Sequence, residues 1–405
     1  MRKLHNSSKI WMLFIVGVVI YSIKIPYTQR IAFYPFLYMC IFLFIIFQQS
    51  IVSNAKVIHH SANCWIAIFL WGVLLSFANG FTQENFTTLM WCLSFVTMPV
   101  VFLYYSMGDK RYRFFRFAIL LACLPIGLLG VYEALTGHYV HETHVSYSYF
   151  KNFMGYYRPN TIFYNVNDNA VFCLISLILS YFVEGTDTFK KWIRIMCLAV
   201  FGFNIIMVDS RGAELGLVVF LCVFYSRTMK AYWKAGALML FPVVLFLGFV
   251  YWDYESFFEF GSRTPVWNIS LSNLRNTGYL GVGPGMIATI NERVFAYADI
   301  YAVHNFILEL FCDFGIFGLV ALLWWYGNLI KVTLAVRTVD PEKSALLFSA
   351  LLAFLAVSIT CSSLVGKSFP VLFFAIIIAE CDLVRKRYQS SMAVDSKSQK
   401  NVLIC

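Results

Sequence analysis

Twelve apolar runs, most of them long enough to cross a lipid bilayer, fill most of this chain of 405 residues. A membrane-spanning helix needs about 17–25 mostly apolar residues. The chain is 60% hydrophobic and only 13% charged, with a mean hydropathy of +0.71, which is more apolar surface than a soluble core requires. The sequence therefore predicts an all-α polytopic membrane protein. The runs cover approximately 9–25, 31–48, 62–79, 86–106, 114–133, 169–183, 192–208, 212–226, 235–251, 305–330, 344–360 and 368–384.

The basic residues predict how these spans are oriented. With the N-terminus placed inside, 22 of the 31 Lys and Arg residues fall on the cytoplasmic side, whereas 13 of the 21 acidic residues fall outside. Cytoplasmic loops of membrane proteins carry an excess of Lys and Arg. The net charge of +10 is therefore a signal of topology and not of a nucleic-acid partner, and both termini are expected in the cytoplasm.

This topology predicts six segments. Spans 1 to 5 occupy 1–133, an outer loop occupies 134–168, and spans 6 to 9 occupy 169–251. A larger outer loop occupies 252–304, spans 10 to 12 occupy 305–384, and a cytoplasmic tail occupies 385–405. No Walker A or Rossmann glycine pattern occurs in the chain, so an ATP-hydrolysing domain is not expected. The chemistry is therefore expected on the outer face.

The cysteines are expected to be small buried apolar residues, because they are scattered singly through the apolar runs and form no CxxC pair. Among the members that lie in these runs are Cys40, Cys64, Cys92, Cys123, Cys173, Cys197 and Cys222.

Four polar stretches converge on the predicted outer face. The first is SRGAELG at 210–216, a turn between two spans that contains Arg211 and Glu214. The second is YRPNTIFYNVNDNAVF at 157–172, and the third is GSRTPVWNISLSNLRNTGYLGVGPG at 261–285, in which Arg263 precedes a helical-looking segment and a glycine-rich turn ends it. The fourth, YAVHNFILELFCDFGIFGL at 301–319, opens a span with His304 and Asn305.

The residue types in these stretches suit an anionic ligand. Arg211 and Arg263 supply two guanidinium groups, which match phosphate oxygens bidentately and hold a pyrophosphate without a metal. His304 is able to take a proton near neutral pH. The remaining polar residues offer supporting hydrogen bonds or charges; they are Asn305, Glu214, Asn165, Asn167, Asp168 and Arg158.

Each of these residues also has a purely structural interpretation. An outer-loop arginine often extends to lipid headgroups, and a histidine at a helix start is often a cap-like or interfacial residue. Two metal sites are also conceivable, one from His138, His141 and His144 at three-residue spacing, and one from Asp253 and Glu255. Neither is favoured, since the helix around the histidines is weak and the acidic pair follows span nine.

Together, the four stretches resemble the O-antigen ligase and O-antigen polymerase superfamily of bacterial membrane glycosyltransferases. The matching pieces are SRGAELG at 210–216, SRTPVWNISLSNLRNTGYLGVGPG at 262–285, HNFILELFCDFGIFGL at 304–319 and, more weakly, N-x-N-D at 165–168. The resemblance covers about residues 155–325, in the family's order relative to the spans.

The resemblance implies a GT-C-like helical fold with a large periplasmic loop that carries short helices. It implies transfer of a glycan from undecaprenyl pyrophosphate to an acceptor hydroxyl, with no metal and no other cofactor. Arg211 and Arg263 would contact the pyrophosphate, and His304 would activate the acceptor. The site would lie on the periplasmic face of the bacterial inner membrane, in contact with membrane lipids.

The acceptor decides which reaction such a protein catalyses. A ligase transfers the glycan to an acceptor glycolipid, lipid A–core, whereas a polymerase transfers it to a second lipid-linked glycan. The SRG and HN stretches favour the ligase type. A transporter of lipid-linked sugars would use the same arginines without chemistry, although the charges here cluster on the outer face and not within several spans.

Overall fold

The computed structural model describes residues 56–106, 109–140, 157–163, 165–183, 185–226, 260–295, 303–358 and 369–385. These residues form helices joined by turns and short loops. The helices are α3 (Lys56–Asn79), α4 (Gln83–Ser106), α5 (Asp109–Thr136), α7 (Val166–Ser180), α8 (Asp187–Val208), α9 (Arg211–Ser226), α12 (Phe260–Asn276), α13 (Met286–Val294), α14 (Phe306–Ala335), the 3-10 turn η3 (Val336–Thr338), α15 (Pro341–Ser358) and a helix over 369–385.

Nine of the twelve predicted spans fall wholly or mostly on described residues, and each overlaps a helix. The predicted spans 9–25, 31–48 and 235–251 lie outside the described residues. Five of the described helices are long and apolar enough to cross a membrane, namely Val57–Asn79, Arg116–Thr136, Asp187–Val208, Phe306–Thr338 and Pro341–Ser358. The described part of the chain is therefore helical, and its apolar helices are those of a multi-pass membrane protein, as the sequence predicts.

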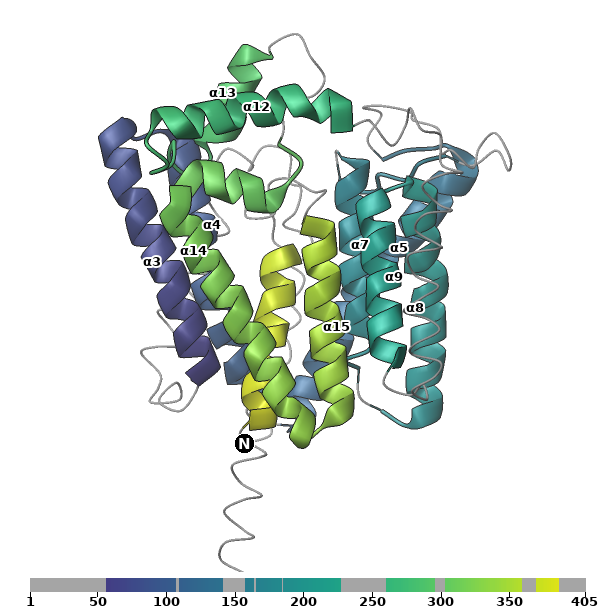
Figure 1. Cartoon of the computed structure of the whole chain (residues 1–405). Helices are drawn as coiled ribbons and strands as arrows, with labels where there is room; N and C mark the ends of the chain where they lie inside the picture. The colour runs from purple at the N-terminus through teal and green to yellow at the C-terminus, as the bar shows by residue number, and fades with distance from the viewer. Residues whose placement is uncertain are drawn as a thin grey trace, which may run out of the picture.

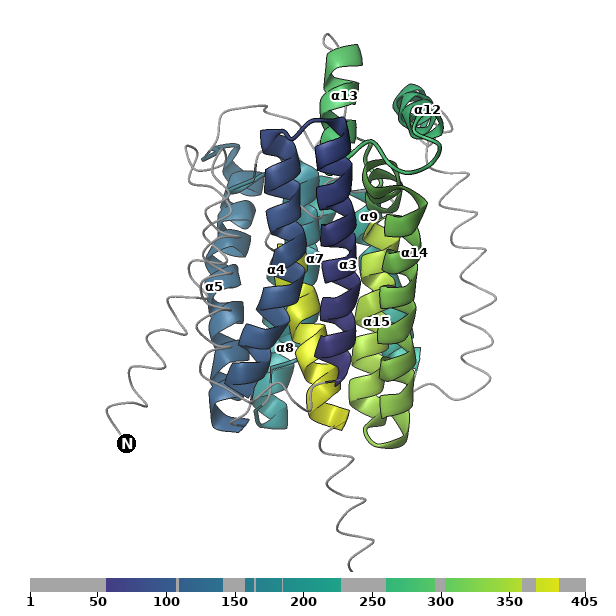
Figure 2. The same cartoon turned by 90° about the vertical axis from the view of Figure 1, so that its left-hand side faces the viewer.

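The long helices form a bundle, and α7 lies in its interior (Figures 1 and 2). Every residue of α7 from Asn169 to Ser180 is buried, and the helix packs against α5, α8 and α9. At about 1.5 Å of rise per residue, its 15 residues span about 22 Å, less than the ~30 Å hydrocarbon core of a bilayer. So short a helix is accommodated because protein, and not lipid, surrounds it.

Aromatic side chains fill the core between α3, α4, α14 and the helix over 369–385. Trp65 stacks on Phe95 with ring centroids 4.1 Å apart, and Trp325 lies 4.7 Å from Phe374. The indole N–H of Trp325 donates to the hydroxyl of Ser61, so the polar atom of this buried ring is satisfied. Part of the chain's high aromatic content is thus explained by packing.

α12 and α13 lie beyond one end of the bundle, where α12 runs across it (Figure 1). A second, smaller hydrophobic core joins them to the start of α14; its buried members are Leu274, Val282, Ile287, Val303 and Cys312. Asn291 of α13 also donates from Nδ2 to the hydroxyl of Ser270 in α12, at 3.0 Å. We call residues 260–295 and 303–314 the cap.

α14 is broken at Gly315, where φ is 67° and ψ is −163°. The sequence predicts a span over 305–330, and α14 covers it, but the structure adds a break: the residues before Gly315 belong to the cap and those after it continue through the bundle. The physical reason is a close approach of two backbones, since a Cβ at Gly315 would collide with the main chain of Leu280. Three backbone hydrogen bonds of 2.9–3.0 Å join 279–283 to 312–316 at this point, from Val282 to Cys312, from Gly283 to Asp313 and from Ile316 to Tyr279.

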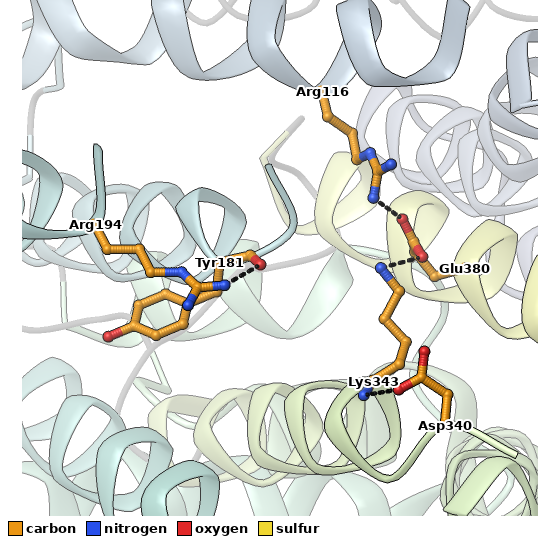
Figure 3. Close-up of polar contacts among 6 residues, drawn as sticks. All are labelled: Arg116, Tyr181, Arg194, Asp340, Lys343 and Glu380. Atoms are coloured by element: carbon orange, nitrogen blue, oxygen red, sulfur yellow. Dashed lines mark hydrogen bonds and ion pairs between the residues drawn. The ribbon is translucent and has the colours of Figure 1, made fainter. Parts of the chain in front are cut away.

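A buried group of charges lies at the other end of the bundle, near the starts of α5 and α15. Figure 3 shows its ion pairs. Glu380 accepts from Arg116 of α5 and from Lys343 of α15, both at 2.7 Å, and Arg116 and Glu380 are almost wholly buried. Near it, Asp382 accepts from the backbone N–H groups of Val57 and Ile58 at the start of α3. The helix over 369–385 thus ties three other helices together with carboxylates.

Most of the described cysteines are buried, as predicted; these are Cys64, Cys92, Cys123, Cys173, Cys197, Cys312 and Cys381. Cys222 is exposed, so the prediction is wrong at this position. The reason is the periodicity of α9, which buries Phe220 and Phe224 on one face and leaves Cys222 on another. Cys40 lies outside the described residues.

Candidate functional site

Arg211 lies at the first position of α9, after a turn of two residues. α8 ends at Val208, Asp209 takes a left-handed conformation with φ 60°, and Ser210 accepts a hydrogen bond from the backbone N–H of Glu214 at 2.9 Å. An aspartate tolerates this conformation better than most residues. The tight turn that the sequence predicts between the two spans is therefore confirmed.

Arg158 joins this turn from a different part of the chain. Its Nη2 lies 3.3 Å from Oδ2 of Asp209. The carboxyl of Glu214 interacts electrostatically with Asp209, Arg211 and Arg158. Two arginines and two carboxylates thus gather at the junction of α8 and α9, and we call these four residues the charge cluster.

The backbone around Arg158 is held by a buried carboxylate. Glu133, near the end of α5, has no exposed surface, and its two oxygens accept from the backbone N–H groups of Val140, Asn160 and Thr161. These three bonds measure 3.2, 3.0 and 2.6 Å. A carboxylate with this many main-chain donors fixes the position of the segment that it binds.

The predicted polar residues of 165–168 lie at the start of α7. Asn165 is the N-cap, and its side-chain oxygen accepts from the N–H of Asn167 at 2.9 Å. Asp168 lies in the first turn of the helix. The oxygen of Asn165 is therefore engaged in capping, and all three residues are half-buried.

The starts of α7 and α9 favour a negative charge between them. The two helices are in contact and run in the same direction, so that both N-termini lie at the end of the bundle that carries the cap (Figure 1). Helix N-termini carry partial positive charge and unpaired N–H groups. With 15 and 16 residues, both helices are shorter than a full membrane span. The arginines of the charge cluster therefore lie beside the helix N-termini. An anion below the membrane surface would contact positive charge from both.

The cap fixes the position of His304. Trp267 of α12 donates from its indole N–H to the carbonyl of Val303 at 2.7 Å. His304 follows with a left-handed φ of 50°, and Asn305 caps α14, accepting from the N–H of Leu308 at 3.0 Å. The sequence predicts that His304 and Asn305 open a helix, and this is confirmed.

Arg263 belongs to the same cap. It lies one turn before Trp267 in α12, whose side chain makes the hydrogen bond to the residue preceding His304. The side chain of Arg263 lies outside the described part of the structure. The cap and the charge cluster are at the same end of the bundle (Figures 1 and 2).

Three residues with clear roles at this end are not singled out by the sequence patterns. They are Glu133, Trp267 and Asp313, whose buried carboxylate accepts from the N–H groups of Gly285 and Ile287 and so caps α13. One signal could have found the two acids, because Glu133 and Asp313 both stand inside predicted spans. A carboxylate at such a depth needs partners. Trp267 carries no comparable signal.

The fold and the site define a multi-pass membrane protein in which two arginines and two carboxylates meet at the end of the bundle that carries the cap, the part of the chain to which His304 belongs. Residues 196–323 match the family model described as O-antigen ligase. The chain is also 24% identical over 369 residues to the teichuronic acid biosynthesis protein TuaE of Bacillus subtilis, an alignment that covers 80% of this chain and 74% of the relative. These matches confirm the resemblance to the O-antigen ligase and polymerase superfamily.

Proposed function

We propose that the chain transfers a glycan from undecaprenyl pyrophosphate to an acceptor hydroxyl at the capped end of the bundle. The observation that carries the proposal is the extent of the family match. Residues 196–323 include the start of α9 with Arg211, the start of α12 with Arg263, and the junction of cap and α14 with His304. The two helix N-termini and the charge cluster support an anionic ligand on physical grounds.

In the proposed mechanism, Arg211 and Arg263 neutralise the pyrophosphate. The acceptor oxygen attacks the anomeric carbon of the glycan, and the bond from that carbon to the pyrophosphate oxygen breaks, with inversion. His304 accepts the proton that the hydroxyl loses. The arginines stabilise the charge that grows on the leaving pyrophosphate, and guanidinium groups do this without a metal ion.

The distribution of charge supports the outer face of the bacterial plasma membrane as the place of reaction. With the capped end outside, the basic loops lie in the cytoplasm, in agreement with the positive-inside rule. Both termini are then cytoplasmic, and the donor and acceptor meet on the periplasmic side.

We propose a ligase-type acceptor, the lipid A–core glycolipid, as the first candidate, in accordance with the family model matched by residues 196–323. The relative that takes part in teichuronic acid biosynthesis favours a second candidate, in which the acceptor is another lipid-linked glycan and the product is a longer polymer. Both candidates use the same donor and the same three residues.

The test is a transfer assay in membranes of cells that lack the endogenous activity. The substitutions are Arg211→Ala, Arg263→Ala and His304→Ala, with Arg275→Ala as the control, because Arg275 is exposed in the last turn of α12, far along the helix from Arg263. Loss of a residue that stabilises transition-state charge typically costs about 100- to 1,000-fold in rate. We expect losses of this order in the three variants and none in the control.

The products distinguish the candidates. Loss of attached glycan while long lipid-linked chains persist identifies a ligase, whereas loss of long chains that leaves single repeat units identifies a polymerase. If all three variants reach normal levels and transfer glycan like the wild type, the roles given to the three residues are wrong; if the wild type itself transfers no glycan, the proposed catalysis is wrong and a transport role takes its place.

A further inference from the structure

Arg158 is held more firmly than a loop arginine usually is. Before it, the N–H of Tyr157 donates to the carbonyl of Ala134 in α5 at 2.9 Å. After it, Asn169 of α7 donates from Nδ2 to the carbonyl of Pro159 at 3.0 Å, and Glu133 accepts from the next two N–H groups. The backbone is therefore anchored on both sides of Arg158, by α5 and by α7.

The side chain of Arg158, in contrast, is only partly satisfied. Its one described ion pair is the 3.3 Å contact from Nη2 to Asp209, and the side chain is 33% exposed. Its Nε is buried and has no hydrogen-bond partner among the described residues. An arginine that faces a carboxylate usually forms two parallel bonds, so a single long contact leaves donors for another acceptor.

Asp209 is placed to hold this arginine only loosely. It is the C-cap of α8 in a left-handed conformation, which ties its position to the turn between α8 and α9. It is also two residues before Arg211, at the N-terminal end of α9. A phosphate that binds Arg211 would lie close to Asp209 and Arg158. It has more oxygens and more negative charge than the carboxylate of Asp209, so it would compete for Arg158.

We propose that Arg158 is a further pyrophosphate-binding residue, and that Asp209 is the internal counter-ion which the pyrophosphate of the lipid-linked donor displaces from it. Two observations carry this inference. The backbone on both sides of Arg158 is anchored, and the Nε of Arg158 has no hydrogen-bond partner among the described residues. Arg158 also contacts Asp209, which lies two residues before Arg211. The inference rests on the proposed function, because it concerns the same donor.

Glu133 is then a positioning residue. It touches no substrate in this account, but its three backbone bonds fix the segment from which Arg158 extends. Such preorganisation improves affinity because the ordering cost is met before the ligand binds. Because Glu133 holds this segment, the backbone of Arg158 has little conformational freedom.

The test measures binding and not turnover. Full-length protein in lipid nanodiscs is titrated with undecaprenyl pyrophosphate and, separately, with undecaprenyl monophosphate. A hydrogen bond to a charged group contributes about 1.5–3 kcal/mol, which corresponds to roughly a tenfold to hundredfold change in affinity. We expect Arg158→Ala to weaken binding of the pyrophosphate by this factor and to reduce its preference over the monophosphate. Arg293→Ala, an exposed arginine of α13, is the control and should bind like the wild type.

The Asp209→Asn substitution tests whether Asp209 acts as a counter-ion or only as a structural residue of the turn. Asparagine also tolerates a left-handed backbone, so the turn is kept while the competing charge is removed. We expect tighter binding of undecaprenyl pyrophosphate, whereas unchanged or weaker binding contradicts the role given to Asp209.

Glu133→Gln tests the positioning role. The amide keeps the size of the side chain but only one of its accepting oxygens, so we expect a reduced preference for pyrophosphate over monophosphate even under conditions where the folded protein is fully retained. An unchanged preference would show that Glu133 serves folding alone.

The outcomes for Arg158 separate this inference from the proposed function. If Arg211→Ala weakens binding and Arg158→Ala does not, the inference is overturned while the proposed donor stands. If the wild type does not bind undecaprenyl pyrophosphate, both are overturned.

Discussion

At the scale of single residues, the capped end depends on backbone conformations that few side chains adopt. Asp209 and His304 both have left-handed φ values, of 60° and 50°. Such positions cost on the order of 1–3 kcal/mol and persist only where their surroundings impose them. Asp209 ends α8, and His304 directly precedes Asn305, the N-cap of α14. Strain of this kind is thus present at two residues of the proposed site.

Gly315 offers the sharpest prediction at this scale. Gly315→Ala combines a backbone conformation that favours glycine with a collision against Leu280, so we expect a loss of stability of more than about 2 kcal/mol. Gly327→Ala in the same helix is the control. Nothing lies within 4 Å of an added Cβ there, and alanine should stabilise the helix by up to about 1 kcal/mol. Thermal unfolding of the purified protein in detergent measures both, and equal melting temperatures would contradict the account of the break.

The same residue shows what the sequence can and cannot predict. Apolar runs predict the described membrane-spanning helices well, because residues that face lipid and residues that face the core are both apolar. The break at Gly315 is not visible in hydropathy, since it results from contact with Leu280, 35 positions earlier. Arg211 and His304 stand at helix starts that the pattern reveals. Glu133 could be suspected from its depth, but its partners, Asn160 and Thr161, depend on how α5 and the following segment fold back on each other.

At the scale of elements, the helix over 369–385 is attached to its neighbours by charge as well as by packing. Arg116 and Lys343 approach Glu380 from α5 and α15, and all three groups are largely removed from solvent (Figure 3). Lys343 also lies 5.2 Å from the ring centroid of Phe182, and Arg194 lies 4.8 Å from that of Tyr181, so cations pack on aromatic faces in the segment after α7. The sequence held a signal for this network, because Glu380 stands inside a predicted span.

Glu380→Gln should destabilise the bundle. It leaves Arg116 and Lys343 without the negative charge that both approach, and breaking a buried ion pair typically costs about 3–5 kcal/mol. The control is Glu342→Gln, an exposed position at the start of α15, where surface charges contribute little. We expect a clear fall in melting temperature for Glu380→Gln only. Equal melting temperatures would show that the network contributes nothing to stability.

At the scale of the whole molecule, the two ends of the bundle differ in kind. One end carries the cap, the charge cluster and the helix starts that favour an anion. The other carries the buried ion network and the connection of α14 to α15. The orientation of the bundle in the membrane therefore decides which compartment the candidate site faces.

Cysteine labelling tests this orientation. Arg293→Cys places a thiol at an exposed position in the cap, and Arg337→Cys places one at an exposed position in η3, at the other end. In intact cells, a membrane-impermeant maleimide should label the first variant above the unsubstituted protein and the second only after permeabilisation. The reverse pattern would place the candidate site in the cytoplasm and contradict the proposed function.

The enclosure of α7 has a consequence for biogenesis. Because its 15 residues are too few to span the hydrocarbon core alone and are buried by α5, α8 and α9, α7 has no stable place in lipid on its own. During synthesis, this segment therefore cannot take its final place in the membrane until α8 and α9 have been synthesised. The start of α7, and Arg158 just before it, therefore reach their final depth only after α9, which ends at Ser226, has been synthesised.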